Sequence, residues 1–377
     1  MKIKILYIVS SLRKAGPIVV LQNLIRHLDK DKYEVAIVKL MGDEPLRSIT
    51  KQFLDDGIKV YELNSSKKQV ELFSNKIARR IDKIVEEFSP DVIHTHGYQA
   101  LLCATKIREN IPIVETLHCI SGEDFIMTHG KMIGSYMNYR YLKALKKISS
   151  AAAISGAVQE YFKTMVPSLS TVLIPNGVQD VPTTLPSKLE LRKKLNINND
   201  SLVFVVVGSL MERKDPITII NAFKKAFPKE RNEDVNLLFI GKGVLEKDCE
   251  KIINGDNRIQ LLGWQIDPYA YLKMADWSVS ATHSEGFGLN FIESLIVGCP
   301  IISTNIAAFI DFDILFPELK DYKFNPGDVE ELSKLMKKAA IDRIDSVKLM
   351  NRTDQYFSSR IMAQKYGAVY QRVLNTD

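Results

Sequence analysis

Short apolar runs alternate with longer amphipathic stretches along the chain, which predicts parallel strands connected by helices. In the first half, the predicted strands are 2–9, 33–39, 58–62, 91–95, 112–116, 150–154 and 171–174. The predicted helices there lie near 17–28, 68–87, 98–108, 131–146 and 156–164. This order is typical of a doubly wound α/β sheet with helices on both faces.

A second series of the same kind follows a polar, proline-containing stretch that ends near residue 188 and that we interpret as a linker. Its predicted strands are 202–207, 235–240, 258–262, 276–280 and 300–303, and its helices lie near 216–226, 244–254, 267–274, 288–297 and 328–340. A chain of 377 residues is also long for one core. We therefore expect two domains, 1–180 and 189–356.

Composition narrows the class of protein. Hydrophobic residues make up 46% of the chain and charged residues 25%, which is ordinary for a soluble globular protein. No apolar run is long enough to span a bilayer, and the first residues resemble a strand rather than a signal peptide. The four cysteines form no C-x-x-C pair, so we expect neither metal ligation nor disulfides, and a cytoplasmic location.

The net charge of +6 is uneven along the chain. Residues 1–180 hold 25 Lys and Arg against 19 Asp and Glu, whereas the remainder holds 26 of each sign. Clusters such as 143–147 are either solvated helix faces or surfaces attracted to anionic lipid headgroups or a phosphorylated lipid acceptor. Nucleic-acid binding is not expected, because no basic motif has interleaved aromatic residues.

The most informative motif places two carboxylates on either side of a glycine turn that opens a helix. Glu285 precedes the turn and Glu293 lies one to two turns into the helix, and the turn itself reads Gly286, Phe287, Gly288 and Leu289. The first amides of a helix suit a phosphate group. Glu285 would lie beside the group attached to that phosphate, and Glu293 could accept hydrogen bonds from a diol. This arrangement predicts a sugar nucleotide as ligand.

This spacing, with Gly-Phe-Gly-Leu inside it, resembles the E-x7-E signature of family 4 retaining glycosyltransferases. The resemblance implies a GT-B fold, in which two doubly wound Rossmann-like domains face a central cleft. It implies that the first domain binds the acceptor, that the second binds the nucleotide sugar, and that the last segment, 357–377, packs back on the first. It also implies that Glu285 lies at the donor sugar, that the loop amides contact the sugar and diphosphate, and that Glu293 binds the ribose.

A second loop, 208–216, resembles the family's G-R-L-x-x-x-K-G motif, whose Arg and Lys neutralise the diphosphate. Lys214 matches the Lys of that motif. Ser209 stands where the family often has Arg, and Asp215 stands where Gly is common. Arg213 is the candidate to compensate, because its forked donors suit phosphate geometry.

Candidate residues in the first half depend on the same resemblance. Gly16 matches one glycine of a loop that faces the donor diphosphate, and His118 follows a predicted strand whose end is near donor sugar and acceptor in related enzymes. We expect His94 and His96 to point to opposite faces of their strand, and hence not to form a zinc pair, with His96 lining the cleft.

Asp311 and Asp313 spell D-x-D, a motif that holds Mn²⁺ or Mg²⁺ in glycosyltransferases of a different fold. Because Lys214 and the helix end already neutralise phosphate, we expect no metal and no cofactor. Trp264 either stacks on the nucleotide base or is simply a half-buried tryptophan.

The resemblance thus implies a metal-independent, retaining hexosyltransferase that uses a nucleoside diphosphate sugar, with a UDP-sugar expected. The acceptor would be a hydroxyl of a glycan or of a polyprenyl-diphosphate-linked oligosaccharide, in bacterial O-antigen, capsule or exopolysaccharide synthesis at the inner face of the membrane. Glu285, His118 and Lys214 are the candidate catalytic residues. Two alternatives remain open: a non-catalytic sugar-nucleotide-binding subunit, motivated by Ser209 and by Ala307-Ala308 in place of a family Gly-Gly pair, and a GT-B nucleotide-sugar epimerase.

Overall fold

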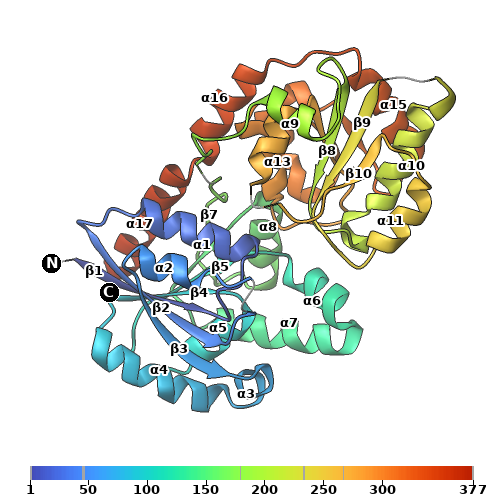
Figure 1. Ribbon diagram of the computed structural model, residues 1–377. Coiled ribbons are helices and arrows are strands. Elements are labelled where there is room, and N and C mark those ends of the chain that lie inside the picture. Colours follow the sequence, from blue (N-terminus) through green and yellow to red (C-terminus); the bar gives the residue numbers. More distant parts are fainter. Residues whose placement is uncertain (1, 45–46, 179, 232–233, 266, 376–377) are drawn as a thin grey trace. The chain divides into compact units, whose positions relative to one another are not determined.

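The computed structural model describes residues 2–44, 47–178, 180–231, 234–265 and 267–375, and it contains two compact units (Figure 1). The first unit combines Met1–Gln179 with Ser359–Asp377, and the second is Asp180–Ser358. Each unit has its own parallel sheet with helices on both faces. The predicted fold class, two doubly wound α/β domains, is confirmed.

The first unit has a seven-stranded parallel sheet in the order β3-β2-β1-β4-β5-β6-β7. Its strands are β1 (Ile3–Val9), β2 (Tyr33–Met41), β3 (Lys59–Ser65), β4 (Val92–His96), β5 (Ile113–Leu117), β6 (Ser150–Ala153) and β7 (Thr171–Leu173). The order reverses between β1 and β4, which pair in register from Ile5 opposite Val92 to Val9 opposite His96. Ligands of doubly wound sheets bind at the carboxyl end of such a reversal.

The helices of the first unit include one, at 50–55, that the sequence patterns did not predict, and they differ from the prediction at two further places. They are α1 (Gly16–His27), α2 (Thr50–Asp55), α3 (Lys67–Leu72), α4 (Ser74–Phe88), α5 (Tyr98–Ala104), α6 (Ser121–His129), α7 (Lys131–Leu145), α8 (Gly156–Met165) and α17 (Ser359–Leu374). The single helix expected over 68–87 is broken at Phe73, whose φ of −123° and ψ of 38° leave the helical region. The segment from Ser121, where no helix was predicted, is helix α6, with Glu123 and Asp124 in its first turn.

The last helix, α17, completes the first unit by packing against α1. Ser359 Oγ donates a hydrogen bond to the carbonyl of Val178 at 2.5 Å. A Cβ on Gly177 would lie only 2.5 Å from Ser359 Cα, so a side chain at this position would block the approach. The turn at Asn176, Gly177 and Val178 therefore fixes where the chain rejoins this unit.

The second unit has a six-stranded parallel sheet in the order β10-β9-β8-β11-β12-β13. Its strands are β8 (Leu202–Val207), β9 (Val235–Ile240), β10 (Ile259–Leu261), β11 (Trp277–Ser280), β12 (Ile301–Thr304) and β13 (Lys323–Phe324). Its α-helices are α9 (Lys188–Lys194), α10 (Pro216–Ala226), α11 (Glu246–Ile253), α12 (Pro268–Met274), α13 (Leu289–Ile296), α14 (Ile310–Leu315), α15 (Val329–Ala339) and α16 (Ser346–Phe357). Short 3₁₀ turns lie at Glu212–Lys214, Lys229–Arg231, Ala307–Phe309 and Pro317–Leu319.

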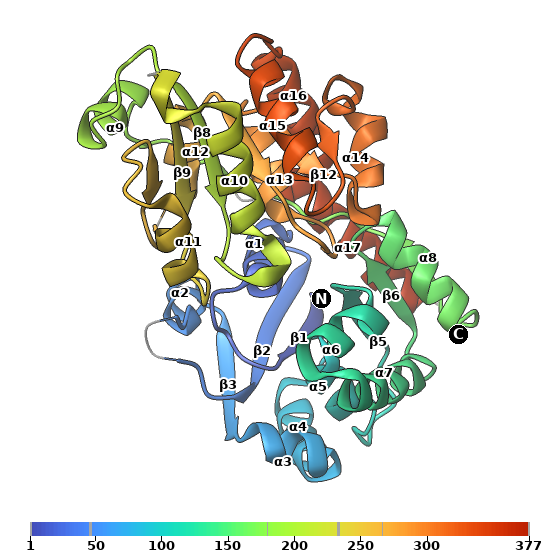
Figure 2. The ribbon, with the colours of Figure 1, turned by 90° about the vertical axis from the view of Figure 1, so that its right-hand side faces the viewer.

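The helices of the second unit cover its sheet in two groups, visible from a second side in Figure 2. Helix α10 packs against α11 and α15, whereas α12 packs against α9 and α13, and α13 packs against α16. Beneath the start of α13 lies a cluster of aromatic rings, in which Phe291 and Phe312 stack with centroids 4.5 Å apart. This apolar base gives the glycine turn above it a rigid support.

Across the described residues, no helix combines the length and the hydropathy that a bilayer-spanning segment requires.

Candidate functional site

The site of the second unit forms where its strand order reverses. Strands β8 and β11 are neighbours in the sheet. The chain continues from β8 to β9 on one side of this pair and from β11 to β12 on the other. The loop after β8 begins at Gly208, and the loop after β11 runs to Gly288, so both lie at one edge of the sheet. This is the position at which open α/β sheets bind ligands, and the sequence order alone did not reveal that these two loops are adjacent.

Three charged side chains meet between these loops. The Lys214 ammonium pairs with Glu285 Oε1, and Arg213 Nη1 lies 3.3 Å from Glu285 Oε2. Arg213 Nη1 also donates to the carbonyl of Ser284 at 2.5 Å. The exposed fraction of the Glu285 side chain is only 12%. Because two cations face one carboxylate, the cluster keeps one net positive charge and can attract an anion.

Backbone contacts hold the two loops together. The amide of His283 donates to the carbonyl of Arg213 at 2.8 Å, and Thr282 Oγ1 donates to the same carbonyl at 3.2 Å. Thr282 Oγ1 also lies 3.3 Å from Glu285 Oε1. Since Arg213 and Lys214 are thereby fixed to the loop that carries Glu285, their positions need little rearrangement when a ligand binds.

Asp215, which departs from the glycine common at its position, has a structural explanation. Its φ is +46°, in the left-handed region that glycine adopts readily and that aspartate tolerates better than most residues. The carboxylate also caps α10, accepting from the Thr218 amide at 3.1 Å, and it lies 3.1 Å from His283 Nε2. The substitution therefore keeps the turn and adds a contact to the opposite loop.

The glycine turn itself is tightly constrained. Gly288 has φ +89°, and a Cβ at this position would lie 2.3 Å from Phe309 Cε1. Helix α13 begins at the next residue, Leu289, so its first amides are left without intrahelical acceptors. Gly286 lies in the same turn, half-buried, and Glu293 is half-buried in the second turn of α13.

Phe287 does not present its side chain to the site. The ring is buried against Phe312 and Phe357, at centroid distances of 5.3 and 5.8 Å. Only the backbone of this candidate donor-binding residue remains to contact a ligand.

Ser209 lies in the loop after β8, where it is exposed. It lines a small cavity together with Gly208, Lys214 and Asn290. The adjacent loop after β9 packs backbone to backbone here, since a Cβ on Gly241 would lie 1.9 Å from the Gly208 carbonyl oxygen. Gly241 of this second loop thus serves close packing.

Asp313 of the D-x-D motif forms its ion pair outside this cluster. Asp313 Oδ1 pairs with Lys323 Nζ at 2.8 Å, a side chain that is only 9% exposed. Within the ranges that the structure describes, no group of three or more His, Cys, Asp or Glu residues is arranged to hold a metal ion.

In the first unit, His118 lies immediately after β5, and its Nε2 is 3.0 Å from His96 Nδ1. The rings of His94 and His96 are 4.5 Å apart, so the expectation that they point to opposite faces was wrong. Residues two apart in a strand share a face. Burial lowers the pKa of His118 to about 4 and that of His94 to about 3, which keeps both imidazoles neutral near pH 7.

His94 joins a buried chain of hydrogen bonds that reaches the last helix. Its Nδ1 is 2.7 Å from Tyr370 Oη and its Nε2 is 2.8 Å from Thr116 Oγ1. Tyr370 Oη in turn shares a hydrogen bond with Tyr7 Oη at 2.9 Å, and Thr116 Oγ1 with Tyr366 Oη at 2.8 Å. The imidazole of His94 is therefore committed to holding α17 on the sheet.

Gly16 is exposed and is the first residue of α1, one position earlier than the sequence pattern indicated. The loop before it is tied down, because the Leu12 amide donates to Asp43 Oδ1 at 2.7 Å.

Sequence reasoning missed Glu115, a fully buried carboxyl in β5. It accepts hydrogen bonds from the Thr95 hydroxyl, from Tyr141 Oη at 2.6 Å and from the Gly97 amide at 3.1 Å. Burial raises its pKa to about 8. A charged residue within an apolar strand, followed by Thr-Leu-His, was the only signal available in the sequence.

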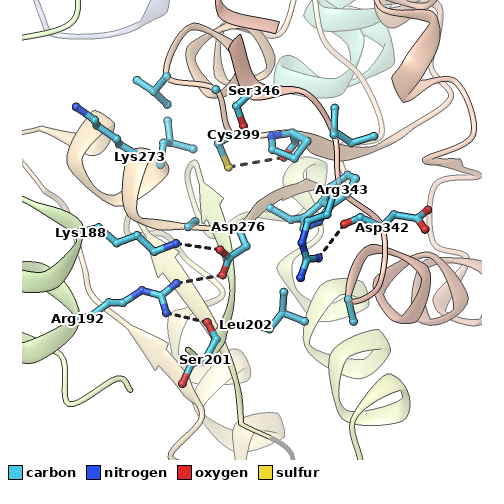
Figure 3. Close-up of a pocket in the computed structure, with 18 of the residues that line it drawn as sticks. Lys188, Arg192, Ser201, Leu202, Lys273, Asp276, Cys299, Asp342, Arg343 and Ser346 are labelled. Carbon is cyan, nitrogen blue, oxygen red and sulfur yellow. Dashed lines mark hydrogen bonds and ion pairs between the residues drawn. The ribbon is translucent and has the colours of Figure 1, made fainter. Parts of the chain in front are cut away.

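A separate polar cavity lies at the opposite edge of the second sheet, where β8, β11 and β12 begin (Figure 3). Its carboxylate Asp276 accepts from Lys188 Nζ at 3.0 Å, from Arg192 Nη2 at 3.1 Å and from the Val203 amide at 2.9 Å. The charges therefore hold α9 against the sheet, and we assign this cavity no catalytic part.

Trp264 follows β10 and is 59% exposed, so the alternative that it is a half-buried tryptophan was wrong.

Comparisons with known proteins agree with this architecture. Residues 187–357 match the family Glycosyl transferases group 1, and residues 16–180 match Glycosyltransferase Family 4. The chain is 23% identical to the O-antigen biosynthesis glycosyltransferase WclY of Escherichia coli, over 99% of this chain and 98% of that protein. It is 25% identical to the UDP-Gal:alpha-D-GlcNAc-diphosphoundecaprenol alpha-1,3-galactosyltransferase of Escherichia coli, over 67% and 68%.

The structure of Anabaena Alr3699/HepE in complex with UDP is similar, with a TM-score of 0.78 and 19% identity over 98% of this chain and 100% of that chain. The two matched families together account for both doubly wound units, and the fold is GT-B. The chain belongs to the family 4 glycosyltransferases and is a glycosyltransferase.

Proposed function

We propose that this protein is a retaining glycosyltransferase that moves a hexose from a nucleoside diphosphate sugar, a UDP-sugar, to a hydroxyl group. The acceptor is a glycan or a polyprenyl-diphosphate-linked oligosaccharide of bacterial surface polysaccharide synthesis. The observation that carries the proposal is the cluster of Arg213, Lys214 and Glu285 at the strand reversal of the second unit. The WclY and galactosyltransferase relatives and the UDP complex of HepE support the pathway and the nucleotide.

In this proposal the second unit binds the donor. The diphosphate lies at the start of α13, against the amides of the Gly286–Leu289 turn and the two cations. Glu293, in the second turn of the same helix, accepts hydrogen bonds from the ribose hydroxyls. The first unit binds the acceptor, with His118 as a neutral hydrogen-bonding group.

The reaction breaks the bond between the sugar C1 and the diphosphate oxygen, and the acceptor oxygen forms the new bond to C1 on the same face. The acceptor proton passes to the departing phosphate oxygen. Negative charge on the diphosphate grows in the transition state, so the fixed cations lower the barrier; one well-placed donor group contributes about 3–4 kcal/mol. Glu285 orients the sugar and balances the positive charge that develops on it.

No metal has a place in this scheme, because Arg213, Lys214 and the helix end supply the positive charge that an ion would otherwise provide. This remains a proposal, to be tested together with the donor.

The deciding experiment is nucleotide release from a panel of nucleotide sugars, with and without EDTA. Release from a UDP-sugar that is insensitive to EDTA would support the proposal and identify the sugar. Release that EDTA abolishes would reinstate Asp311 and Asp313 as metal ligands. Isomerised donor without release would indicate an epimerase.

A further inference from the structure

Helices α6 and α7 form a hairpin on the first unit and lie side by side in both ribbon views (Figures 1 and 2). They cross closely, since a Cβ on Gly134 would lie 2.5 Å from the backbone of Phe125. One face of α7 packs into the unit through Met137, Tyr141 and Leu145, all buried. The hairpin is thus held in place through this buried face of α7.

The opposite face carries large apolar side chains that nothing covers in the described structure. Met132 is 88% exposed, Ile133 61%, and Tyr136 and Tyr139 60% each. Met132, Tyr136 and Tyr139 follow a spacing of four and three residues, so they form one stripe along α7. At the end of α6, Ile126 and Met127 add to this apolar surface.

The charge along α7 and the turn after it has one sign, whereas α6 carries the exposed Glu123 in its first turn. The exposed lysines Lys131, Lys143, Lys146 and Lys147 flank it, and none has an ion-pair partner in the part of the chain that the structure describes. Between Asp124 and Glu160 the sequence contains no Asp or Glu. We call the six apolar residues and four lysines together the α6–α7 face.

We propose that the α6–α7 face docks on the surface of an anionic lipid bilayer. The methionine and isoleucine side chains enter the boundary between headgroups and acyl chains, the tyrosines lie at headgroup level, and the lysines approach lipid phosphates. Tyrosine suits this depth because its ring is apolar and its hydroxyl is polar.

The charge distribution favours a lipid surface over a second copy of the chain. A twofold dimer through this face would bring the lysines of one copy against those of the other, and the acidic residues of the hairpin, Glu123 and Asp124, lie only in the first turn of α6. An anionic membrane offers the complementary sign to all four lysines at once. The proposal goes beyond the transferase activity and does not depend on the identity of the donor.

The test is co-sedimentation with vesicles of phosphatidylcholine alone and of phosphatidylcholine with phosphatidylglycerol. Binding is expected only with phosphatidylglycerol, and it should weaken as salt is raised. Two variants change the apolar and the basic part of the face separately. The apolar variant is Met132→Ser/Ile133→Ser/Tyr136→Ser, and the basic variant is Lys143→Glu/Lys146→Glu/Lys147→Glu. Each should weaken binding by about tenfold or more.

Matched controls change equally exposed residues elsewhere. Ile314→Ser/Ile341→Ser removes apolar side chains that are 78% and 80% exposed in the second unit, and Lys67→Glu/Lys68→Glu reverses exposed lysines of α3. Both should bind vesicles like the wild type. Donor hydrolysis in the absence of vesicles should be the same in all five proteins, which separates failure of docking from failure of the transferase.

Equal vesicle binding by the wild type and both face variants would overturn the proposal, as would no binding at all. Sedimentation equilibrium supplies a second measurement. A wild-type dimer that the apolar variant converts to monomer would assign the face to a second copy instead.

Discussion

The carboxylate of Glu285 pairs with the ammonium of Lys214, although the two residues lie 71 positions apart in the chain. Both side chains are mostly buried, with exposed fractions of 12% and 20%. In the absence of ligand, the carboxylate of Glu285 therefore forms ion pairs with the two cations that we propose to bind the diphosphate. A bound diphosphate must compete with Glu285 for Lys214 and Arg213.

The first prediction follows from this competition. Glu285→Gln should lose most of its turnover, because the group that faces the sugar is gone, while UDP binds as tightly as in the wild type or more tightly. Lys214→Ala should lower kcat by about 10²–10³-fold and weaken UDP binding. Calorimetric titration with UDP and donor-hydrolysis rates measure the two effects. Weaker UDP binding in Glu285→Gln would contradict the assigned roles.

A second prediction concerns the glycine turn. Gly288→Ala introduces strain at φ +89° and a clash with Phe309, so it should destabilise the second unit by about 2–4 kcal/mol and impair UDP binding. Gly255→Ala is the control, because Gly255 has φ +71° but a Cβ there would meet nothing within 4 Å. It should show the strain alone, about 1 kcal/mol. Urea unfolding followed by the fluorescence of Trp277 reports on this unit. Equal effects of the two variants would show that the contact with Phe309 is unimportant.

The third prediction is acid sensitivity of the first unit. Burial holds the pKa of His94 at about 3 and that of His118 at about 4, whereas an exposed histidine has 6.5. Below pH 6.5 the unfolded chain takes up protons that the folded unit does not, so stability falls from about pH 6.5 toward pH 4. Hydrogen exchange of peptides spanning β4 and β5, corrected for intrinsic rates, measures this. His94→Gln should make the decline shallower; an unchanged profile would count against the mechanism.

Glu115 gives a fourth prediction with the opposite sign. Its pKa is raised from 4.5 to about 8 in the folded protein, so the folded unit holds a proton that the unfolded chain releases. Its contribution to stability is present below pH 4.5 and is lost as the pH rises to about 8. Glu115→Gln should remove this decline in the same exchange measurement.

The hydrogen bonds to Glu115 can be tested separately. Tyr141→Phe removes one donor and should cost about 1–3 kcal/mol, whereas Tyr139→Phe, at an exposed position of the same helix, should be neutral. A neutral Tyr141→Phe would show that this contact adds nothing to the stability of the unit.

The fifth prediction concerns metal. Donor hydrolysis should continue at the same rate in EDTA, and Asp311→Asn should be active. Asp313→Asn should reduce stability rather than activity, because it leaves the buried ammonium of Lys323 without its partner. Restoration of activity by added Mn²⁺ after chelation would refute this assignment.

Local patterns in the sequence determined much of this protein. Alternating apolar runs and amphipathic stretches fixed nearly all strands to within a few residues, because burial on both faces of a parallel sheet requires continuous apolar segments. The glycine turn before α13 was identifiable for a similar reason, since a positive φ and a close approach require glycine at Gly288. The break at Phe73 and the helices α2, α6, α9, α14 and α16 were not predicted; all of these helices except α16 are shorter than ten residues and give a weak periodic signal.

Contacts between distant segments were decided only by the tertiary structure. The sequence named Arg213, Lys214 and Glu285 separately, but only the reversal between β8 and β11 brings them together. Glu115 acquires its raised pKa from burial, which depends on α7 covering β5. The two faces of α7 have similar composition, so only packing decides which face is buried and which remains exposed. Pairing across a sheet and burial are properties of neighbours in space, and the order of residues does not state them.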